Sequence, residues 1–206
     1  MNVISNALST VKSVIYFVVA LISITLTSSI NANEISIEQE GQEGQIELGI
    51  ANEAREVDLL VRQSGIENLL DASFGSNVGA SIEQSGNFGS IKLETLLDKN
   101  SQYQINQIGD HNELNGIFSG NSNSAEIDQS GTSNLLTLDV GGESNKLIID
   151  QGGANNRTSL SASGNASNFD VSQHGDNNNI DINSFSSNTS VSITQSGSGE
   201  SITIDQ

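Results

Sequence analysis

The sequence predicts an all-β solenoid over residues 33–206, in which short parallel strands stack into two facing sheets. Three observations predict it: a tripeptide Gln-x-Gly that recurs eight times, apolar residues that alternate with a period of two, and the complete absence of Pro. A fixed repeat of 20–50 residues is typical of solenoids and other repeat architectures. Alternation with a period of two is typical of strands, whereas a helix would need apolar spacings of three and four.

The repeat is defined by eight glutamines, separated by steps of 24, 21, 23, 22, 22, 22 and 22 residues. They are Gln39, Gln63, Gln84, Gln107, Gln129, Gln151, Gln173 and Gln195. Each unit of about 22 residues is expected to form one rung of the solenoid, and each rung is named below by its Gln. One such unit cannot bury its apolar face alone, but stacked units can.

Each rung is predicted to hold two short strands. Two residues before every Gln stands an Ile or Val that should point inward: Ile37, Val61, Ile82, Ile105, Ile127, Ile149, Val171 and Ile193. Apolar residues also recur four residues before the Gln and seven and nine residues after it, where Thr158 and Gly116 are the only exceptions in the last two columns. One strand should therefore end at the Gln, and a second should begin about five residues later.

A short arc is expected between the two strands of a rung. Glycine follows each Gln by two residues, at Gly41, Gly65, Gly86, Gly109, Gly131, Gly153, Gly175 and Gly197. A glycine at a fixed turn position indicates a positive φ angle that other residues resist. The irregular steps fall in the other arc, which is therefore expected to be an exposed and tolerant loop.

The repeated amides are predicted to stabilise the stack. A buried side-chain amide is costly unless it is paired, and stacked copies can pair with the rungs above and below, so the eight Gln are expected to form an amide ladder. Asn stands five residues after the Gln in five rungs, at Asn68, Asn112, Asn134, Asn156 and Asn178. For these Asn, a stacked ladder and a simple turn-capping role both remain open.

Residues 1–32 are predicted to be a secretory signal peptide. One basic residue, Lys12, precedes an apolar run over residues 14–26 and a stretch of mostly small residues that ends at Ala32. The apolar run is shorter than the roughly 20 residues of a transmembrane helix, although an uncleaved membrane anchor is the alternative. Cleavage after Ala32 would leave a mature chain with 6 basic and 25 acidic residues and no transmembrane segment.

Composition excludes several functional classes. The formal net charge of −18 disfavours nucleic acid as a partner, and the absence of Cys excludes a disulfide scaffold or a thiolate site. No catalytic, cofactor or metal motif is found, and His111 and His174 lie in arcs without a recurring carboxylate partner. The chain is therefore expected to be neither an enzyme nor a cofactor-binding protein.

The edges of the predicted stack suggest self-association. Neither terminal rung contains Pro or Lys, the residues that commonly blunt exposed strand edges. A top edge that matches a bottom edge makes a heterologous contact, which propagates as an open filament. The expected product is a cross-β fibre of this chain with itself, and a monomeric surface adhesin or binding solenoid is the alternative.

The repeat resembles that of the curlin family, the subunits of bacterial curli fibres. Ser101, Gln107, Gly109 and Asn112 fit the first four fixed positions of the curlin unit Ser-x5-Gln-x-Gly-x2-Asn-x-Ala-x3-Gln, as do Ser167, Gln173, Gly175 and Asn178. The resemblance covers essentially all of residues 33–206. The sequence departs from the unit at the second Gln position, which only Gln206 fills.

The resemblance implies a function, a location and partners. Curlin subunits are secreted through the periplasm of Gram-negative bacteria and assemble outside the cell into functional amyloid for biofilm matrix, surface adhesion and cell aggregation. The implied partners are further copies of the chain, a second curlin subunit, an outer-membrane secretion channel and periplasmic chaperones. The regular last rung favours the major, fibre-forming type of subunit over the minor, nucleating type.

Overall fold

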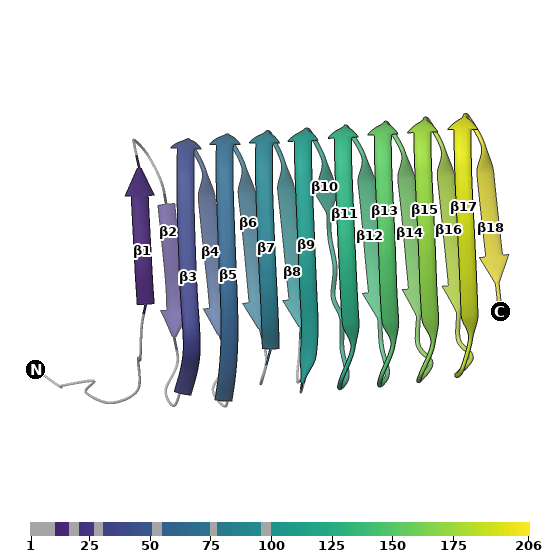
Figure 1. Ribbon diagram of the computed structural model, residues 1–206, viewed down its shortest axis with the longest axis horizontal. Coiled ribbons are helices and arrows are strands. Elements are labelled where there is room, and N and C mark those ends of the chain that lie inside the picture. The colour runs from purple at the N-terminus through teal and green to yellow at the C-terminus, as the bar shows by residue number, and fades with distance from the viewer. Residues whose placement is uncertain (1–10, 17–20, 27–30, 51–54, 75–77, 96–99) are drawn as a thin grey trace, which may run out of the picture.

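The computed structural model describes residues 11–16, 21–26, 31–50, 55–74, 78–95 and 100–206. The described residues contain strands and no helix, and the strands form two nine-stranded parallel sheets (Figure 1). The prediction of an all-β solenoid with two facing parallel sheets and a repeat of about 22 residues is confirmed. The described residues contain no helix that is long and apolar enough to cross a membrane.

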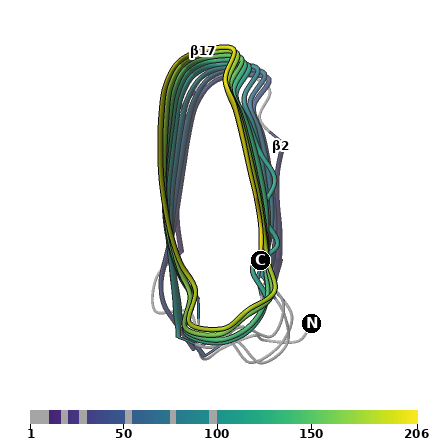
Figure 2. The ribbon, with the colours of Figure 1, turned by 90° about the vertical axis from the view of Figure 1, so that its right-hand side faces the viewer.

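The chain alternates between the two sheets. The first sheet contains β1 (Val11–Tyr16), β3 (Asn31–Gln42), β5 (Arg55–Ile66), β7 (Val78–Asn87), β9 (Ser101–Asp110), β11 (Ser124–Thr132), β13 (Lys146–Ala154), β15 (Asn168–Asp176) and β17 (Ser190–Ser198). The second contains β2 (Leu21–Leu26), β4 (Gln45–Ile50), β6 (Leu69–Phe74), β8 (Ser90–Thr95), β10 (Glu113–Leu114), β12 (Leu135–Val140), β14 (Arg157–Ala162), β16 (Asn179–Ser184) and β18 (Ser201–Asp205). Viewed along the stack, the rungs superimpose as a flattened, elongated loop (Figure 2).

The register is set by the repeat, so that like residues lie over like. Gln107 pairs with Gln129, and Gln129 with Gln151, in the ladder of β9, β11 and β13. The eight predicted inward Ile and Val residues are all buried, with exposed fractions of 0–6%. Since only two strands enclose the interior of each rung, β-branched and Leu side chains fill most of it, which fits the low aromatic content.

The Gln107 rung departs from the predicted pattern, because its second strand, β10, has only two residues. Gly116 stands where the other rungs carry an inward Leu, Ile or Ala, while the ring centroids of Tyr103 and Phe118 lie 4.7 Å apart in the interior. A Cβ atom at Gly116 would lie 3.1 Å from the carbonyl oxygen of Lys92 and 3.3 Å from the Leu93 side chain, both in the preceding rung. The backbone leaves the strand conformation here, with positive φ angles at Gly116 (107°) and Ile117 (130°).

The N-terminal segment also differs from expectation. In the full chain, β1 and β2 add a further pair of strands below β3 and β4, although residues 1–32 were expected to lie outside the solenoid. Both strands are rich in β-branched residues and Leu, which suits their parallel pairing with β3 and β4. Their register places Ile15 beside Gln39, so the glutamine pattern does not extend into this pair. Cleavage after Ala32 remains a prediction.

Candidate functional site: the amide ladders and the arcs

The eight glutamines form one continuous column of side-chain hydrogen bonds through the interior. Each Nε2 donates to the Oε1 of the next Gln along the chain, in seven bonds of 2.7–2.9 Å from Gln39 to Gln195. All eight side chains are at least 95% buried. Since a buried amide without partners is expensive, this column favours the observed register over any shifted one.

The column has two different ends. Among the described residues, the Oε1 of Gln39 accepts no hydrogen bond, and the Nε2 of Gln195 donates none. One end therefore presents a free acceptor, and the other presents a free donor. A neighbouring rung that carries Gln in the same register would satisfy either of them.

Backbone and hydroxyl groups complete the column. The second proton on Nε2 of Gln129 is directed to the carbonyl of Glu113 at 3.1 Å, and that of Gln173 to the carbonyl of Arg157 at 3.2 Å. Thr158, an exception in the apolar pattern, donates through its hydroxyl to Oε1 of Gln173 at 3.1 Å. The hydroxyl at this position was visible in the sequence, but only the structure shows that it joins the glutamine column.

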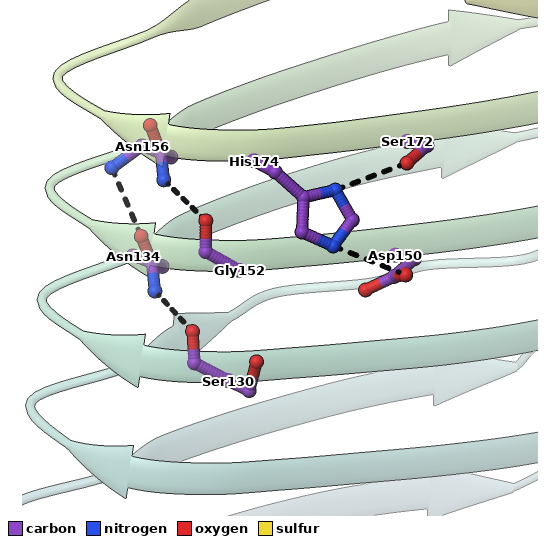
Figure 3. Close-up of polar contacts among 7 residues, drawn as sticks. All are labelled: Ser130, Asn134, Asp150, Gly152, Asn156, Ser172 and His174. Atoms are coloured by element: carbon purple, nitrogen blue, oxygen red, sulfur yellow. Dashed lines mark hydrogen bonds and ion pairs between the residues drawn. The ribbon is translucent and has the colours of Figure 1, made fainter. Parts of the chain in front are cut away.

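Unlike the glutamines, the asparagines use their side-chain amides to bond backbone groups of their own arc and of the next rung. Nδ2 of Asn134 donates to the carbonyl of Ser130 in its own arc at 2.8 Å and to that of Gly153 in the next rung at 2.9 Å. Its Oδ1 accepts the backbone N–H of Asn156 at 3.0 Å (Figure 3). Each such Asn therefore caps its own arc and also fastens it to the next rung, which combines the two roles that the sequence left open.

Asn68, Asn112, Asn156 and Asn178 repeat this pattern, and each is buried.

Gly44 and Gly89 replace Asn in two rungs, and a side chain at either position would collide with the amide of Gln39 or Gln84.

The second arc, which links one rung to the next, contains a second asparagine column that sequence reasoning missed. Asn123 and Asn145 are 1% exposed and make the same bonds: Nδ2 of Asn145 donates to the carbonyls of Gly141 and Gly164, and its Oδ1 accepts the N–H of Ser167. These residues lie 11 positions after Asn112 and Asn134. An 11-residue comparison of the sequence with itself would have found them, whereas alignment on Gln alone did not.

The arc glycines allow adjacent rungs to approach closely. Their φ angles lie between 106° and 135°. A Cβ atom at Gly131 would lie 2.1 Å from the carbonyl oxygen of Gly153, and the same collision recurs from Gly41 to Gly175. Gly197 has no such neighbour among the described residues. Glycine is therefore required both by the backbone angle and by the stacking of the arcs.

The outer faces are acidic and show isolated pairings. Asp128 and Asp150 lie side by side in register, as expected from the sequence. His174 Nε2 lies 3.4 Å from Asp150 Oδ2, and its Nδ1 lies 3.1 Å from the hydroxyl of Ser172 (Figure 3). Arg62 pairs with Glu38 at 3.0 Å. The groups in these pairs are about half exposed, so the pairs contribute little stability.

No arrangement typical of catalysis or metal binding occurs in the part of the chain that the structure describes. It contains no group of three or more Asp, Glu or His side chains placed to hold a metal ion. The two histidines lie three rungs apart: His111 stacks on Phe88, and His174 contacts Asp150. The distinctive chemistry of the molecule is thus its repeated amide pairing.

Comparison of the chain with protein-family models, with curated proteins and with solved structures finds no match.

Proposed function

We propose that this chain is a secreted structural subunit that assembles head to tail with copies of itself into a cross-β fibre of the curli type. The main support is the glutamine column, because its free acceptor at Gln39 and free donor at Gln195 are complementary. A second copy placed in the same register would continue the column across the junction. It would also continue the parallel backbone ladders of both sheets.

Removal of the N-terminal segment fits this proposal. In the full chain β1 lies against β3, with Ile15 in register with Gln39, so the free acceptor faces a rung that has no amide at that position. Cleavage after Ala32 would remove β1 and β2 and leave β3 and β4 as an edge that matches β17 and β18. We therefore expect processed chains to assemble and unprocessed chains to assemble more slowly.

The proposed setting is the surface of a Gram-negative bacterium, where the fibres would contribute to biofilm matrix and adhesion. Export would use the periplasm, periplasmic chaperones and an outer-membrane channel, and a second curlin subunit would nucleate growth. The resemblance of the repeat to curlin supports this setting, and the regular Gln195 rung supports the role of major subunit.

Seeded assembly tests the proposal. Purified chain beginning at Asn33 should form fibres with a lag phase that preformed fibres remove, and electron microscopy should show unbranched filaments. Gln-to-Ala substitutions at Gln84, Gln129 or Gln195 should slow elongation more than Ser192→Ala, which changes an exposed hydroxyl. Protein that stays monomeric for days in the presence of seeds would refute the fibre and favour a monomeric binding solenoid.

A further inference from the structure

Three adjacent rungs, those of Gln63, Gln84 and Gln107, carry exposed apolar side chains on their first arcs. The first arc is the segment that joins the two strands of one rung, at the upper edge of Figure 1. Four large apolar side chains are exposed there: Ile66 (43%), Leu69 (37%), Phe88 (46%) and Ile108 (55%). We call these four residues the arc ridge.

The members of the arc ridge lie on adjacent rungs. The backbone N–H of Phe88 donates to the carbonyl of Ile66 at 2.8 Å, and that of Leu69 to the carbonyl of Gly89 at 3.0 Å. Ile108 pairs in register with Ser85 in the rung of Phe88. The Phe88 ring also stacks on the imidazole of His111 in the next rung, with centroids 4.9 Å apart. The four ridge residues therefore lie on three adjacent rungs.

The solenoid itself gives no reason for these residues. Ser133, Asn155 and Asn177 occupy the position of Phe88 in later rungs, with nearly the same φ angles of 55–58°. A left-handed backbone suits Asn and is unfavourable for a bulky aromatic residue, so Phe88 makes the arc less stable than Asn would. Strain combined with exposure of a large apolar group indicates a binding role.

Carboxylates are frequent on the arcs that carry the ridge and on the adjacent arc of the Gln39 rung. The first-arc segments 40–45, 64–69, 85–90 and 108–113 contain five carboxylates and no Lys or Arg. These carboxylates belong to Glu40, Glu43, Glu67, Asp110 and Glu113. The corresponding segments of the last four rungs contain only two carboxylates, Asp176 and Glu200, together with Arg157. Three of the five carboxylates thus lie on the arcs that carry the ridge, and the other two lie on the adjacent arc of the Gln39 rung.

We propose that the arc ridge binds a cationic amphipathic segment of another protein, with its apolar side chains on the ridge and its Lys or Arg side chains beside the flanking carboxylates. A second copy of this chain fits less well, because two such acidic surfaces would repel each other at a net charge of −18 per chain. The site lies on the side of the stack, so it would stay accessible in a fibre. The proposal does not depend on fibre formation.

A variant that should still fold can be designed from residues that occur in other rungs. The triple variant Ile66→Thr, Phe88→Asn and Ile108→Ser uses residues found at the same positions of other rungs, namely Thr132, Asn155 and Ser130. The matched control is Phe185→Ser, which removes a 67%-exposed apolar residue from a second arc, where Ser163 stands one rung earlier. Circular dichroism should show the same β-sheet spectrum for the variants as for the unchanged protein.

The probe is a labelled helical peptide with one face of Leu and flanking Lys, and binding is measured by fluorescence anisotropy. The dissociation constant should rise about tenfold or more in the triple variant, because each apolar contact that is lost weakens binding several-fold. It should stay unchanged in the Phe185→Ser control. Replacement of the peptide's Lys by Glu, or of its Leu by Ser, should each abolish binding. A photo-crosslinker on the peptide should label residues 64–69, 85–90 or 108–113.

Equal binding to the triple variant and to the unchanged protein would overturn the proposal, as would crosslinks elsewhere on the acidic surface. A triple variant that changes only the concentration dependence of sedimentation would also overturn it and assign the ridge to contacts between copies of this chain.

Discussion

Truncation of one internal glutamine should destabilise the fold strongly, because two neighbours would lose their partners together. Gln129 donates to Gln151 at 2.9 Å and to the carbonyl of Glu113 at 3.1 Å, and it accepts from Gln107 at 2.8 Å. In Gln129→Ala, Oε1 of Gln151 would be buried without a donor, and Nε2 of Gln107 would keep only its 3.4 Å contact with the carbonyl of Ser90. At about 1–3 kcal/mol for each unsatisfied buried group, the free energy of unfolding should fall by about 3–5 kcal/mol.

The same truncation at the end of the column should cost less. In Gln195→Ala, Gln173 loses one bond but keeps its 3.2 Å bond to the carbonyl of Arg157, so the loss should be about 1 kcal/mol. Ser192→Ala, on the outer face, should cost less than about 0.5 kcal/mol. Urea unfolding of freshly diluted monomer, followed by circular dichroism, measures all three. Equal losses for Gln129→Ala and Gln195→Ala would refute the cooperative ladder.

Three further outcomes are expected. Gly131→Ala should prevent stable folding or lower the urea midpoint markedly, since its Cβ would lie 2.1 Å from a carbonyl oxygen, whereas Gly49→Ala, with nothing within 4 Å, should leave the midpoint unchanged. The combination Tyr103→Ala, Gly116→Leu and Phe118→Val, which copies the interior of the next rung, should lengthen β10 and slow hydrogen exchange at residues 115–118; unchanged exchange would show that these three residues do not cause the short strand. Raising the NaCl concentration from about 10 to about 150 mM should shorten the lag of assembly by screening the acidic chains, and a longer lag would contradict this.

Repetition made the main fold features predictable from the sequence. The Gln, Gly and Ile/Val columns each recur in all eight rungs, so they specify the strand period, the first arc and the register together. The function of the Asn residues was harder to predict. Their bonds go to backbone carbonyls of two different rungs, and a sequence shows side-chain types rather than backbone positions.

Two local features were not predictable for physical reasons. The short β10 coincides with the Tyr103–Phe118 ring contact and with Gly116, and that ring contact becomes evident only when the two strands face each other. The regular second arc was obscured because its early copies vary in length, while its later copies follow the first arc by 11 residues. In the N-terminal segment, the same apolar run is compatible with both a signal peptide and strands, so composition alone does not separate them.

The single direction of the glutamine hydrogen bonds has an electrical consequence. All seven bonds run from Nε2 of one rung to Oε1 of the next in the same sense, so the side-chain amide dipoles add along the axis as peptide dipoles add along a helix. A filament built from such units would carry an aligned dipole array over its whole length. Its two tips would then differ in sign of potential, and dilute filaments should orient in an applied field.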